Sequence, residues 1–456
     1  MRFSLRSFLI LFFLLGLTHC GFHKPHVRVL PKTDTLDRKI LFIGLDGMGY
    51  AMMKELKDEG YYRGFSEPIP LIVPFPSATT IGFTGIFQAL DVGTVPGYET
   101  RFYSFKDDKI IGGTPFDVYK IPINYKYYFD SFRHTMTEKA IMYGFPGVAG
   151  MQDLERARRL VMNSPKKVVF SYLGGTDGAQ HLLGRNRTKR FMKFMDSYLE
   201  RIKKEYENKF HAPLEIVLFS DHGFHYDKMH LMTAADIEKV IKGRGFKLAS
   251  HLRNNPKNVV TVRFGLLSAG ALFTHPSSVT EVARLVNGVE GIDLVFWPEK
   301  NRIYVLNGKN EEAYFEYESK RHYKYVSIKG DPLHYLGGKT ILKLSDDQWF
   351  KKTWNEQYPD AGYRLYDAFH HLVENKAGIL FSLKPKYQFG SMAALTGTQL
   401  KFGHKGTHGA LFQDVSQGVV MTDNPKIKLP QALRYDDFFN VFIPKVVDAV
   451  KKCGVH

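Results

Sequence analysis

Cysteine is scarce in this chain of 456 residues, which contains only Cys20 and Cys453. No internal disulfide can form if Cys20 is modified, so the fold must be stabilised by a hydrophobic core, for which the chain is long enough. The sequence also lacks internal repeats and low-complexity segments, which argues against a repeat array or a disordered chain. One large α/β domain with an insertion, or two to three ordinary domains, remain as organisations.

No arginine-rich arm accompanies the strongly basic composition. The formal net charge is +17 and the isoelectric point about 9.4, whereas the hydrophobic and charged fractions of 44% and 24% are ordinary for a globular protein. A basic surface favours anionic partners such as phosphate esters, nucleic acid or an anionic membrane. Because the basic residues are spread along the chain, we interpret most of them as a solvated face. We therefore expect no nucleic-acid binding by this basic surface.

A long apolar run is missing except near the N-terminus, at residues 8–17. This run follows two arginines and has the length of a signal-peptide core, which is too short for a comfortable transmembrane helix. Residues 1–20 are therefore predicted to be a signal peptide of a protein exported to the bacterial periplasm or cell envelope. The segment ends in Leu-Thr-His-Cys, which resembles the lipobox of bacterial lipoproteins except for His19. A lipid anchor to the membrane on Cys20, a plain cleaved signal and an uncleaved anchor are the alternatives.

Residues 39–47, KILFIGLDG, predict a strand that ends in a carboxylate. Large apolar residues dominate residues 40–45, as in a strand buried on both faces of a parallel sheet. Asp46 follows directly, and a carboxylate beside an apolar core needs a partner. Ligand sites of open α/β sheets form at the carboxyl ends of the strands, so Asp46 is a candidate metal ligand or catalytic carboxylate. An ordinary Asp-Gly turn is the alternative.

A second strand, predicted at residues 69–73, leads into a cluster of hydroxyl side chains. Ser77, Thr79 and Thr80 lie just before an apolar, helix-like run at residues 83–90. A threonine in this place can cap the helix. It can also be a nucleophile at a helix N-terminus, where backbone N–H groups favour a bound phosphate. The residues themselves leave both roles open.

Two further predicted strands end in acidic and imidazole side chains. Asp177 and His181 follow the strand at 167–173, and Asp221 and His222 follow the strand at 213–219. Asp177 and His181 would share one face of a helical turn, and their types suit a borderline divalent metal such as zinc. Three strands thus place ligand-type side chains at the edge of the sheet where ligands bind.

The alternation of strands and helices is interrupted in the second half of the chain, where short strand-like runs alternate with polar turns. The predicted organisation is a signal peptide at 1–20, a first core segment at 38–245, an inserted α+β cap at 246–390 and a second core segment at 391–452. A strand at 378–383 is expected to return to the core. A glycine-rich loop with His404 and His408 follows, and a helix over 435–452 is expected to close the chain.

Five short motifs resemble the alkaline phosphatase superfamily and, within it, the type I phosphodiesterase and nucleotide pyrophosphatase family. They are Gly-Leu-Asp-Gly at 44–47, Phe-Pro-Ser-Ala-Thr at 75–79, Asp-Gly-Ala-Gln-His at 177–181, Ser-Asp-His-Gly at 220–223 and Gly-Thr-His-Gly at 406–409. Each motif is weak alone, but their shared order is specific. The resemblance covers about residues 38–245 and 390–450. It implies an α/β fold, the alkaline-phosphatase-like three-layer sandwich with a mostly parallel central sheet and an inserted α+β cap.

This resemblance implies a hydrolase with two zinc ions. Asp177, His181 and His408 would hold one ion, and Asp46, Asp221 and His222 the other, with Thr79 bridging toward it. Two metals about 3.5–4 Å apart can clamp the attacking and leaving oxygens of an in-line phosphoryl transfer. The resemblance further implies attack by Thr79, a covalent phospho-threonine, and its hydrolysis at the same site.

The chain departs from the family just after the nucleophile position. Diesterases of this family usually carry Pro-Asn there, whereas this chain has Ile81-Gly82. Either a backbone N–H or a cap residue replaces the amide, or the substrate differs, or the activity is weakened. The remaining assignments are Thr80 as alternative nucleophile, His404 as alternative ligand to His408, and His225 and His230 as surface or supporting residues.

The sequence therefore predicts an exported zinc-dependent hydrolase of small-molecule phosphate esters. A phosphodiesterase or nucleotide pyrophosphatase is favoured over a phosphomonoesterase or phosphotransferase. A sulfatase is disfavoured because no cysteine occupies the nucleophile position. A non-catalytic surface lipoprotein that keeps the fold and binds a partner through its basic cap is the alternative from another class.

Overall fold

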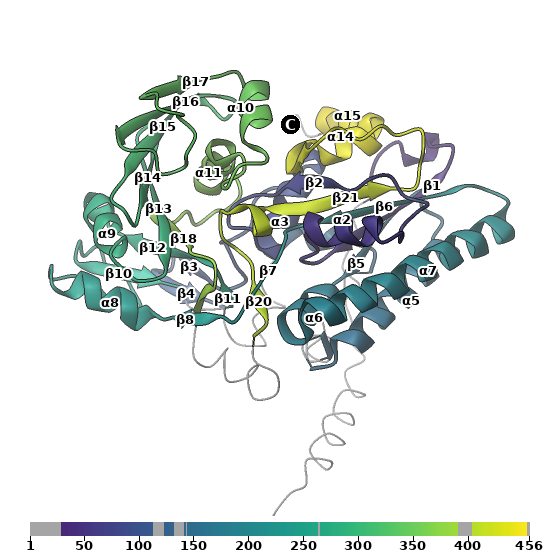
Figure 1. The fold of residues 1–456 in the computed structure, drawn as a ribbon, viewed down its shortest axis with the longest axis horizontal. Coiled ribbons are helices and arrows are strands. Elements are labelled where there is room, and N and C mark those ends of the chain that lie inside the picture. Colours follow the sequence, from purple (N-terminus) through teal and green to yellow (C-terminus); the bar gives the residue numbers. More distant parts are fainter. Residues whose placement is uncertain are drawn as a thin grey trace, which may run out of the picture.

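A computed structural model describes residues 29–112, 123–131, 141–142, 144–262, 265–390 and 404–453. The predicted signal peptide and Cys20 lie outside these residues. Figure 1 shows two large sheets side by side, a six-stranded sheet on the right and a nine-stranded sheet on the left. No helix within the described ranges combines the length and apolarity that crossing a membrane requires.

The six-stranded sheet has the order β22-β2-β21-β6-β1-β5. Its strands are β1 (Lys39–Leu45), β2 (Ile69–Ile72), β5 (Val168–Leu173), β6 (Leu214–Ser220), β21 (Gln417–Thr422) and β22 (Leu433–Arg434). β1 is parallel to both β5 and β6, and β2 is parallel to β22. β21 runs antiparallel to its neighbours β2 and β6. The sheet is therefore mostly parallel, as predicted.

Helices cover both faces of this sheet, which gives the core its three layers (Figure 1). Side chains of β1 alternate between the faces, with Phe42 packed into one hydrophobic cluster and Leu41 and Ile43 into another. The first face is covered by α3 (Thr79–Phe87), α14 (Phe438–Phe442) and α15 (Pro444–Cys453), and the second by α2 (Tyr50–Asp58), α5 (Pro146–Asn163) and α7 (Arg185–Phe210). Burial on both faces explains why the strand is apolar throughout.

The nine-stranded sheet has the order β17-β16-β15-β14-β13-β18-β12-β10-β9. Its strands are β9 (Lys247–Leu248), β10 (Asn258–Thr261), β12 (Ala269–Thr274), β13 (Ile292–Glu299), β14 (Arg302–Asn307), β15 (Glu312–Ser319), β16 (His322–Lys329), β17 (Ile341–Lys343) and β18 (Ile379–Leu383). Four helices belong to this part of the fold: α8 (Ala234–Lys242), α9 (Val279–Val286), α10 (Asp346–Thr353) and α11 (Ala361–His370). Except for α8, these elements lie in the region that the sequence predicts as an α+β cap.

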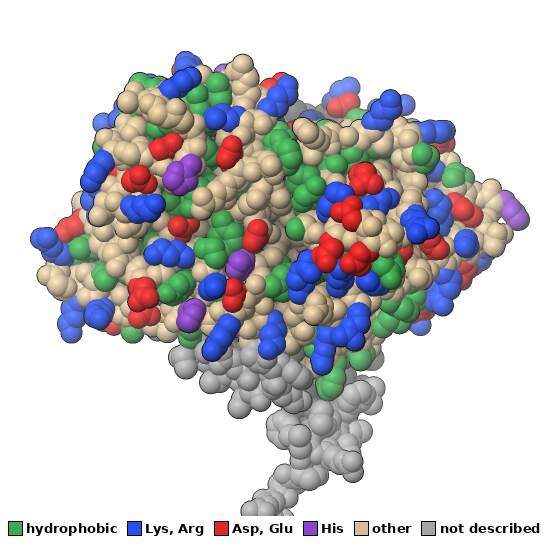
Figure 2. Space-filling view, in the orientation of Figure 1, with side chains coloured by type: hydrophobic (Ala, Val, Ile, Leu, Met, Phe, Trp, Pro, Cys, Tyr) green, Lys and Arg blue, Asp and Glu red, His purple; other side chains and the backbone are tan. Residues whose placement is uncertain are grey.

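Shorter elements join the two parts of the fold. The strands β8 (His230–Met232), β11 (Leu266–Leu267) and β19 (Tyr387–Gly390) form one small sheet, β7 (His225–Tyr226) and β20 (Gly406–Thr407) a second, and β3 (Phe102–Ser104) and β4 (Lys109–Ile111) a third. The short helices are α6 (Gly175–Leu183), α13 (Gln413–Ser416), η1 (Thr33–Thr35), η2 (Gln88–Leu90), η4 (Asn124–Tyr127), η5 (Pro276–Ser278) and η6 (Tyr435–Asp437). On the face drawn in Figure 2, Lys and Arg side chains are scattered among Asp and Glu.

Two predictions about the C-terminal half were wrong. The strand expected to return to the core, β18, instead pairs with β12 and β13 in the nine-stranded sheet. Its residues are buried there on both faces, so their apolar pattern matches either sheet. The strands of this part of the chain that enter the core sheet are β21 and β22. The expected single closing helix is broken into η6, α14 and α15, because Pro444 has no backbone N–H to continue α14.

Candidate metal centre and nucleophile

The predicted ligand residues converge at the carboxyl edge of the core sheet. Asp46 follows β1, Asp177 and His181 lie on α6 just after β5, Asp221 and His222 follow β6, and His408 follows β20. All six side chains are buried, and those of Asp221 and His222 are 0% exposed. Since residues this polar are rarely buried without partners, their convergence indicates a built site.

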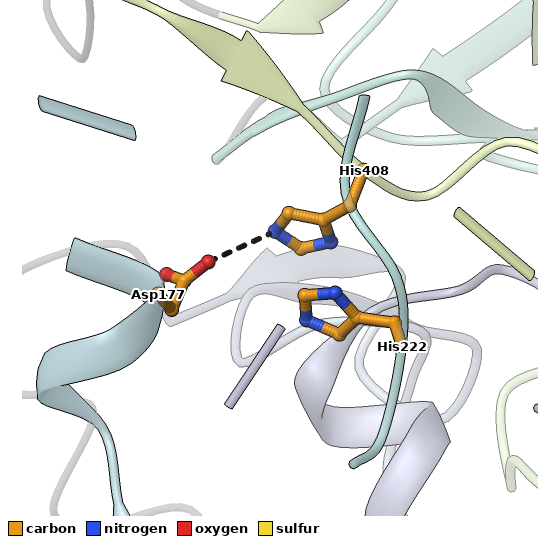
Figure 3. A group of neighbouring side chains, drawn as sticks. All are labelled: Asp177, His222 and His408. Carbon is orange, nitrogen blue, oxygen red and sulfur yellow. Dashed lines mark ion pairs between the residues drawn. The ribbon is translucent and has the colours of Figure 1, made fainter. Parts of the chain in front are cut away.

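Asp177 lies between two imidazoles. Its Oδ1 is 3.2 Å from His181 Nε2 and 3.8 Å from His408 Nε2. Figure 3 shows that Asp177 points toward His408, whose ring lies against that of His222. The two rings are stacked, with centroids 3.8 Å apart and planes inclined by 11°.

His222 joins this group to the remaining carboxylates. Its Nε2 is 3.4 Å from Asp46 Oδ1 and 3.5 Å from Asp221 Oδ2. Ligand atoms of Asp46, Asp221 and His222 lie within 4.8 Å of one another, as do those of Asp177, His222 and His408. The structure thus brings all six predicted residues together. His222 belongs to both groups. His181 belongs to neither group but contacts Asp177.

Backbone carbonyls fix the orientation of the three imidazoles. The Nδ1 atoms of His181, His222 and His408 lie 3.2, 2.9 and 3.0 Å from the carbonyl oxygens of Gly406, Gly223 and Ser77. A carbonyl only accepts, so each Nδ1 carries the proton. In the neutral form of each ring, the lone pair is on Nε2 and faces the cluster, which is the tautomer that a metal ligand requires.

The carboxylates are held in a strongly charged, dry environment. Burial raises the pKa of Asp46, and the neighbouring Asp177 adds to this effect. Burial also raises the pKa of Asp221 well above its ordinary value. Burial opposes ionisation of Asp177 as well, but the neighbouring imidazoles of His181, His408 and His222 together outweigh it and lower the pKa of that carboxyl.

The imidazoles respond to the same surroundings in opposite directions. Burial alone would lower the pKa of His222, but the adjacent Asp221 raises it to about 9. Burial lowers the pKa of His408 well below its ordinary value. The buried Asp221 Oδ2 has no hydrogen-bond partner among the described residues. A buried carboxylate oxygen in that state calls for a cation, and three Asp oxygens with three His nitrogens are a donor set that suits zinc.

Thr79 is the first residue of α3, not its cap. The cap residue is Ala78, so the capping role considered for Thr79 is wrong, and the helix begins four residues before the predicted run. Thr79 Oγ1 lies 3.2 Å from Asp46 Oδ1 and 3.5 Å from His222 Nε2. The side chain of Thr80 instead lies beside the hydroxyl of Tyr125. Of the two threonines, Thr79 is the one that faces the cluster.

The glycine that departs from the family pattern is required by packing. A Cβ atom at Gly82 would lie 2.3 Å from the backbone oxygen of Asp221, well inside van der Waals contact. Helix α3 therefore approaches the end of β6 more closely than a side chain would allow. This close approach brings Thr79 to the cluster, and it leaves no room for the amide of the family diesterases.

Several supporting residues gave no recognisable signal in the sequence. Tyr172 donates a hydrogen bond to Asp46 Oδ2, and Thr176 Oγ1 donates to the Asp46 carbonyl oxygen at 2.7 Å. Gln180 Nε2 donates to Gly47 O at 2.9 Å. Tyrosine, threonine and glutamine are common at strand ends and in helices, so only the structure identifies them as holding Asp46 in place.

The other predicted histidines lie beside the cluster. His404 Nδ1 is 3.0 Å from Gln388 Oε1, and the His404 ring is 5.1 Å from that of His181. Burial lowers the pKa of His404 to about 3. His225 Nδ1 pairs with Asp414 at 3.0 Å, and His230 is exposed.

No protein-family model matches the chain, and no curated protein is significantly similar to it in sequence. Among solved structures, phosphonoacetate hydrolase from Sinorhizobium meliloti 1021 with phosphonoformate aligns at a TM-score of 0.51 and 12% identity, over 91% of this chain and 96% of that one. Human ectonucleotide pyrophosphatase/phosphodiesterase 5 aligns at a TM-score of 0.48 and 10% identity, over 91% of this chain and 95% of that one. An inactive form of the murine protein of the same name, in complex with AMP, aligns at a TM-score of 0.47 and 10% identity, over 90% of this chain and 95% of that one.

These alignments concern the fold, since every identity is far below 25%. The fold is assigned from the match to the phosphonoacetate hydrolase, whose TM-score is 0.51. This chain has the alkaline-phosphatase-like α/β fold, and the resemblance drawn from the five motifs is confirmed at that level.

Proposed function

We propose that this protein is a metal-dependent hydrolase of phosphate esters, with Thr79 as its nucleophile. The observation that carries the proposal is the position of the Thr79 hydroxyl. It lies at the start of α3, 3.2 Å from Asp46 Oδ1 and 3.5 Å from His222 Nε2, beside a buried cluster of ligand-type side chains. A hydroxyl in that place can be activated by a cation and can attack a phosphate seated on the helix N-terminus.

The residues of the cluster fit two zinc ions. Asp177, His181 and His408 would hold one ion, and Asp46, Asp221 and His222 the other, with His222 close to both groups. When bound, the metal supplies positive charge that lowers the pKa of a hydroxyl and stabilises the charge of the transition state. The protein contributes the fixed imidazole tautomers and the supports from Tyr172 and Thr176 that orient Asp46.

In the proposed reaction, the protein's own groups bind the phosphate and provide the attacking oxygen. Helix α3 offers the unsatisfied N–H groups of its first turn to the phosphate oxygens. The oxygen of Thr79 forms a bond to phosphorus, the bond to the ester oxygen breaks, and the alcohol leaves with a proton. Water then cleaves the phospho-threonine, which restores the hydroxyl and releases phosphate or a monoester.

Diesters are the favoured substrates, but the packing of Gly82 supports a second candidate. Because no side chain fits at Gly82, the amide that family diesterases direct at a phosphate oxygen is absent. A monoester or phosphotransfer substrate, whose phosphate carries more charge, depends less on that single donor. The solved neighbour that hydrolyses phosphonoacetate makes phosphonates a further class to include.

A panel of substrates tests this proposal. Purified protein loaded with zinc would be assayed against a chromogenic diester, a chromogenic monoester, nucleotides, lipid-headgroup and sugar diesters, and phosphonoacetate. Thr79→Ala should abolish turnover with metal content unchanged, whereas Thr79→Ser should retain part of the rate because the hydroxyl survives. Full activity of Thr79→Ala would refute the nucleophile. Metal binding without turnover of any substrate would favour the non-catalytic alternative.

Export is a separate part of the proposal. The apolar run at 8–17 and the lipobox-like ending at Cys20 support cleavage near residue 20 and a lipid on that cysteine. Mass spectrometry of the mature N-terminus in a bacterial envelope fraction tests both. A mature chain that starts well beyond Cys20 would exclude the lipid anchor.

A further inference from the structure

Arg364 is a fully buried arginine on α11, a helix that belongs to the cap part of the fold. Its side chain is 0% exposed. Within the described residues, its hydrogen bonds all go to neutral oxygen atoms. Burial lowers its pKa to about 10, which still leaves it charged at neutral pH. Burying a guanidinium without a bonded carboxylate is costly, so its contacts require an explanation.

The guanidinium joins two loops that carry site residues. Nη2 donates to Ser77 Oγ at 2.9 Å and to Pro74 O at 3.5 Å, and Nη1 donates to Leu411 O at 3.2 Å. The first loop leads directly into Thr79, and the second follows directly after His408. The two arms of the planar fork thus hold the loop of the nucleophile and the loop of a candidate ligand at a fixed separation.

Ser77 is the residue where these two loops meet. Its N–H donates to Gly409 O at 3.1 Å, and its Oγ donates to Ala410 O at 3.1 Å. Its carbonyl oxygen accepts the Nδ1–H of His408 at 3.0 Å. The orientation of the His408 ring therefore depends on the placement of Ser77, which Arg364 contacts.

We propose that Arg364 is a positioning residue: it holds Ser77 in place and thereby orients both the Nε2 of His408 and the hydroxyl of Thr79. A lysine could not replace it, because one ammonium cannot present two nitrogen atoms in a fixed plane to two loops. A residue of the cap thus completes the geometry of a site built on the core sheet. The kinetic part of this inference rests on the proposed catalytic role of Thr79, and the metal-binding part rests only on the proposed zinc ligands.

The chain offers a matched control in Arg434. This arginine, on β22 of the core, is also buried and also joins core to cap, through Asp360 at 2.6 Å and Asp346 at 2.7 Å. Within the described residues, the hydrogen bonds and ion pairs of its side chain go to Asp346 and Asp360 and not to the loops that Arg364 joins. Arg434→Lys should therefore weaken the cap–core contact without altering the site.

The test compares Arg364→Lys with Arg434→Lys in the full chain. Zinc affinity would be measured by competition with a chromophoric chelator, with kcat, KM and the thermal midpoint in parallel. For Arg364→Lys we expect zinc affinity about 10-fold weaker and kcat about 10- to 100-fold lower, with KM nearly unchanged, as for other residues that orient ligands. For Arg434→Lys we expect only a lower thermal midpoint.

A second, smaller substitution tests the same contact in case Arg364→Lys does not fold. Ser77→Ala removes the hydroxyl that Arg364 contacts and leaves the backbone groups in place, so it should weaken zinc binding in the same direction. If the arginine acts through Ser77, the effects of Ser77→Ala and Arg364→Lys on zinc affinity should not add in the double variant.

Unchanged zinc affinity in both Arg364→Lys and Ser77→Ala would overturn the inference. So would an Arg434→Lys variant that loses zinc affinity and kcat to the same extent, since that would indicate a general role of cap docking. If the wild-type protein turns over no ester while Arg364→Lys still weakens zinc binding, the proposed function fails and the positioning role stands.

Discussion

Replacing Gly82 by alanine tests the close approach of α3 to β6. An alanine Cβ at this position would lie 2.3 Å from Asp221 O and 2.9 Å from Asp221 Cβ. The nearest atom belongs to the backbone at the end of a central strand, so it cannot rotate away. The clash should therefore move α3 away from the sheet or displace Asp221, and either movement separates Thr79 from the cluster.

The size of the effect follows from two opposing terms. In a helix, alanine is favoured over glycine by about 1 kcal/mol. Overpacking a rigid core typically costs about 1–3 kcal/mol, and a contact more than 1 Å inside the usual 3.5–4.0 Å separation belongs at the upper end of that range. We therefore expect Gly82→Ala to lower the free energy of unfolding by about 2 kcal/mol. It should also weaken zinc binding, because Asp221 is a candidate ligand.

Gly147 provides the control. It also lies in a helix, α5, but a Cβ there would have no neighbour within 4 Å. Gly147→Ala should leave the thermal midpoint unchanged or raise it, because the helical preference acts alone. Differential scanning fluorimetry and zinc competition on the two variants measure both quantities. If Gly82→Ala is as stable as Gly147→Ala and binds zinc normally, the packing argument for the glycine is wrong.

Three further predictions concern the site and its surroundings. Thr80→Ala should lower turnover by less than about 10-fold, because its side chain faces Tyr125; if it abolishes turnover while Thr79→Ala does not, the nucleophile is Thr80. Asp221→Ala and His408→Ala should each lose bound zinc, measured by elemental analysis, with the fold retained; full metal content in both would refute the ligand assignment. Burial raises the pKa of Glu99 to about 8, above about 4.3 for an unfolded glutamate. The folded state then binds more protons than the unfolded state, so stability should fall as pH rises through this window. The thermal midpoint should decrease more between pH 5 and pH 9 in the wild type than in Glu99→Gln, and equal decreases would contradict the raised pKa of Glu99.

The position of the candidate site could be predicted from sequence because each candidate ligand follows an apolar strand or lies in a recognisable loop. Asp46 and Asp221 are found this way, and the topology rule places both at one edge of the sheet. Their grouping could not be predicted. His222 lies between the two carboxylates and stacks on His408, a contact between residues far apart in the chain that depends on strand order and side-chain rotamers.

The wrong predictions have different physical causes. Apolar periodicity reports how deeply a strand is buried but not which strand it pairs with, so β18 and β21 could not be assigned to their sheets. Helix α3 begins at Thr79 because tertiary packing fixes its first turn, although threonine and glycine are poor helix formers. Arg364 gave no signal for a related reason, since an arginine in a helix is ordinarily exposed.

The strand β21 determines when the site can be assembled during synthesis. Its residue Val420 pairs with Ile69 on one side and Phe219 on the other, so it joins β2 to the rest of the core sheet. The second neighbour of β2, β22, lies even later in the chain. The nine-stranded sheet, in contrast, is complete once β18 has been made. A growing chain can therefore finish its cap while the strand leading to Thr79 is still without partners, and pairing over such long separations is slow. A chain that stops before β21 would still hold Asp46 and Asp221 on the paired strands β1 and β6, but it would have no strand to bring Thr79 to them. C-terminal truncation should therefore be as damaging as loss of the Thr79 hydroxyl.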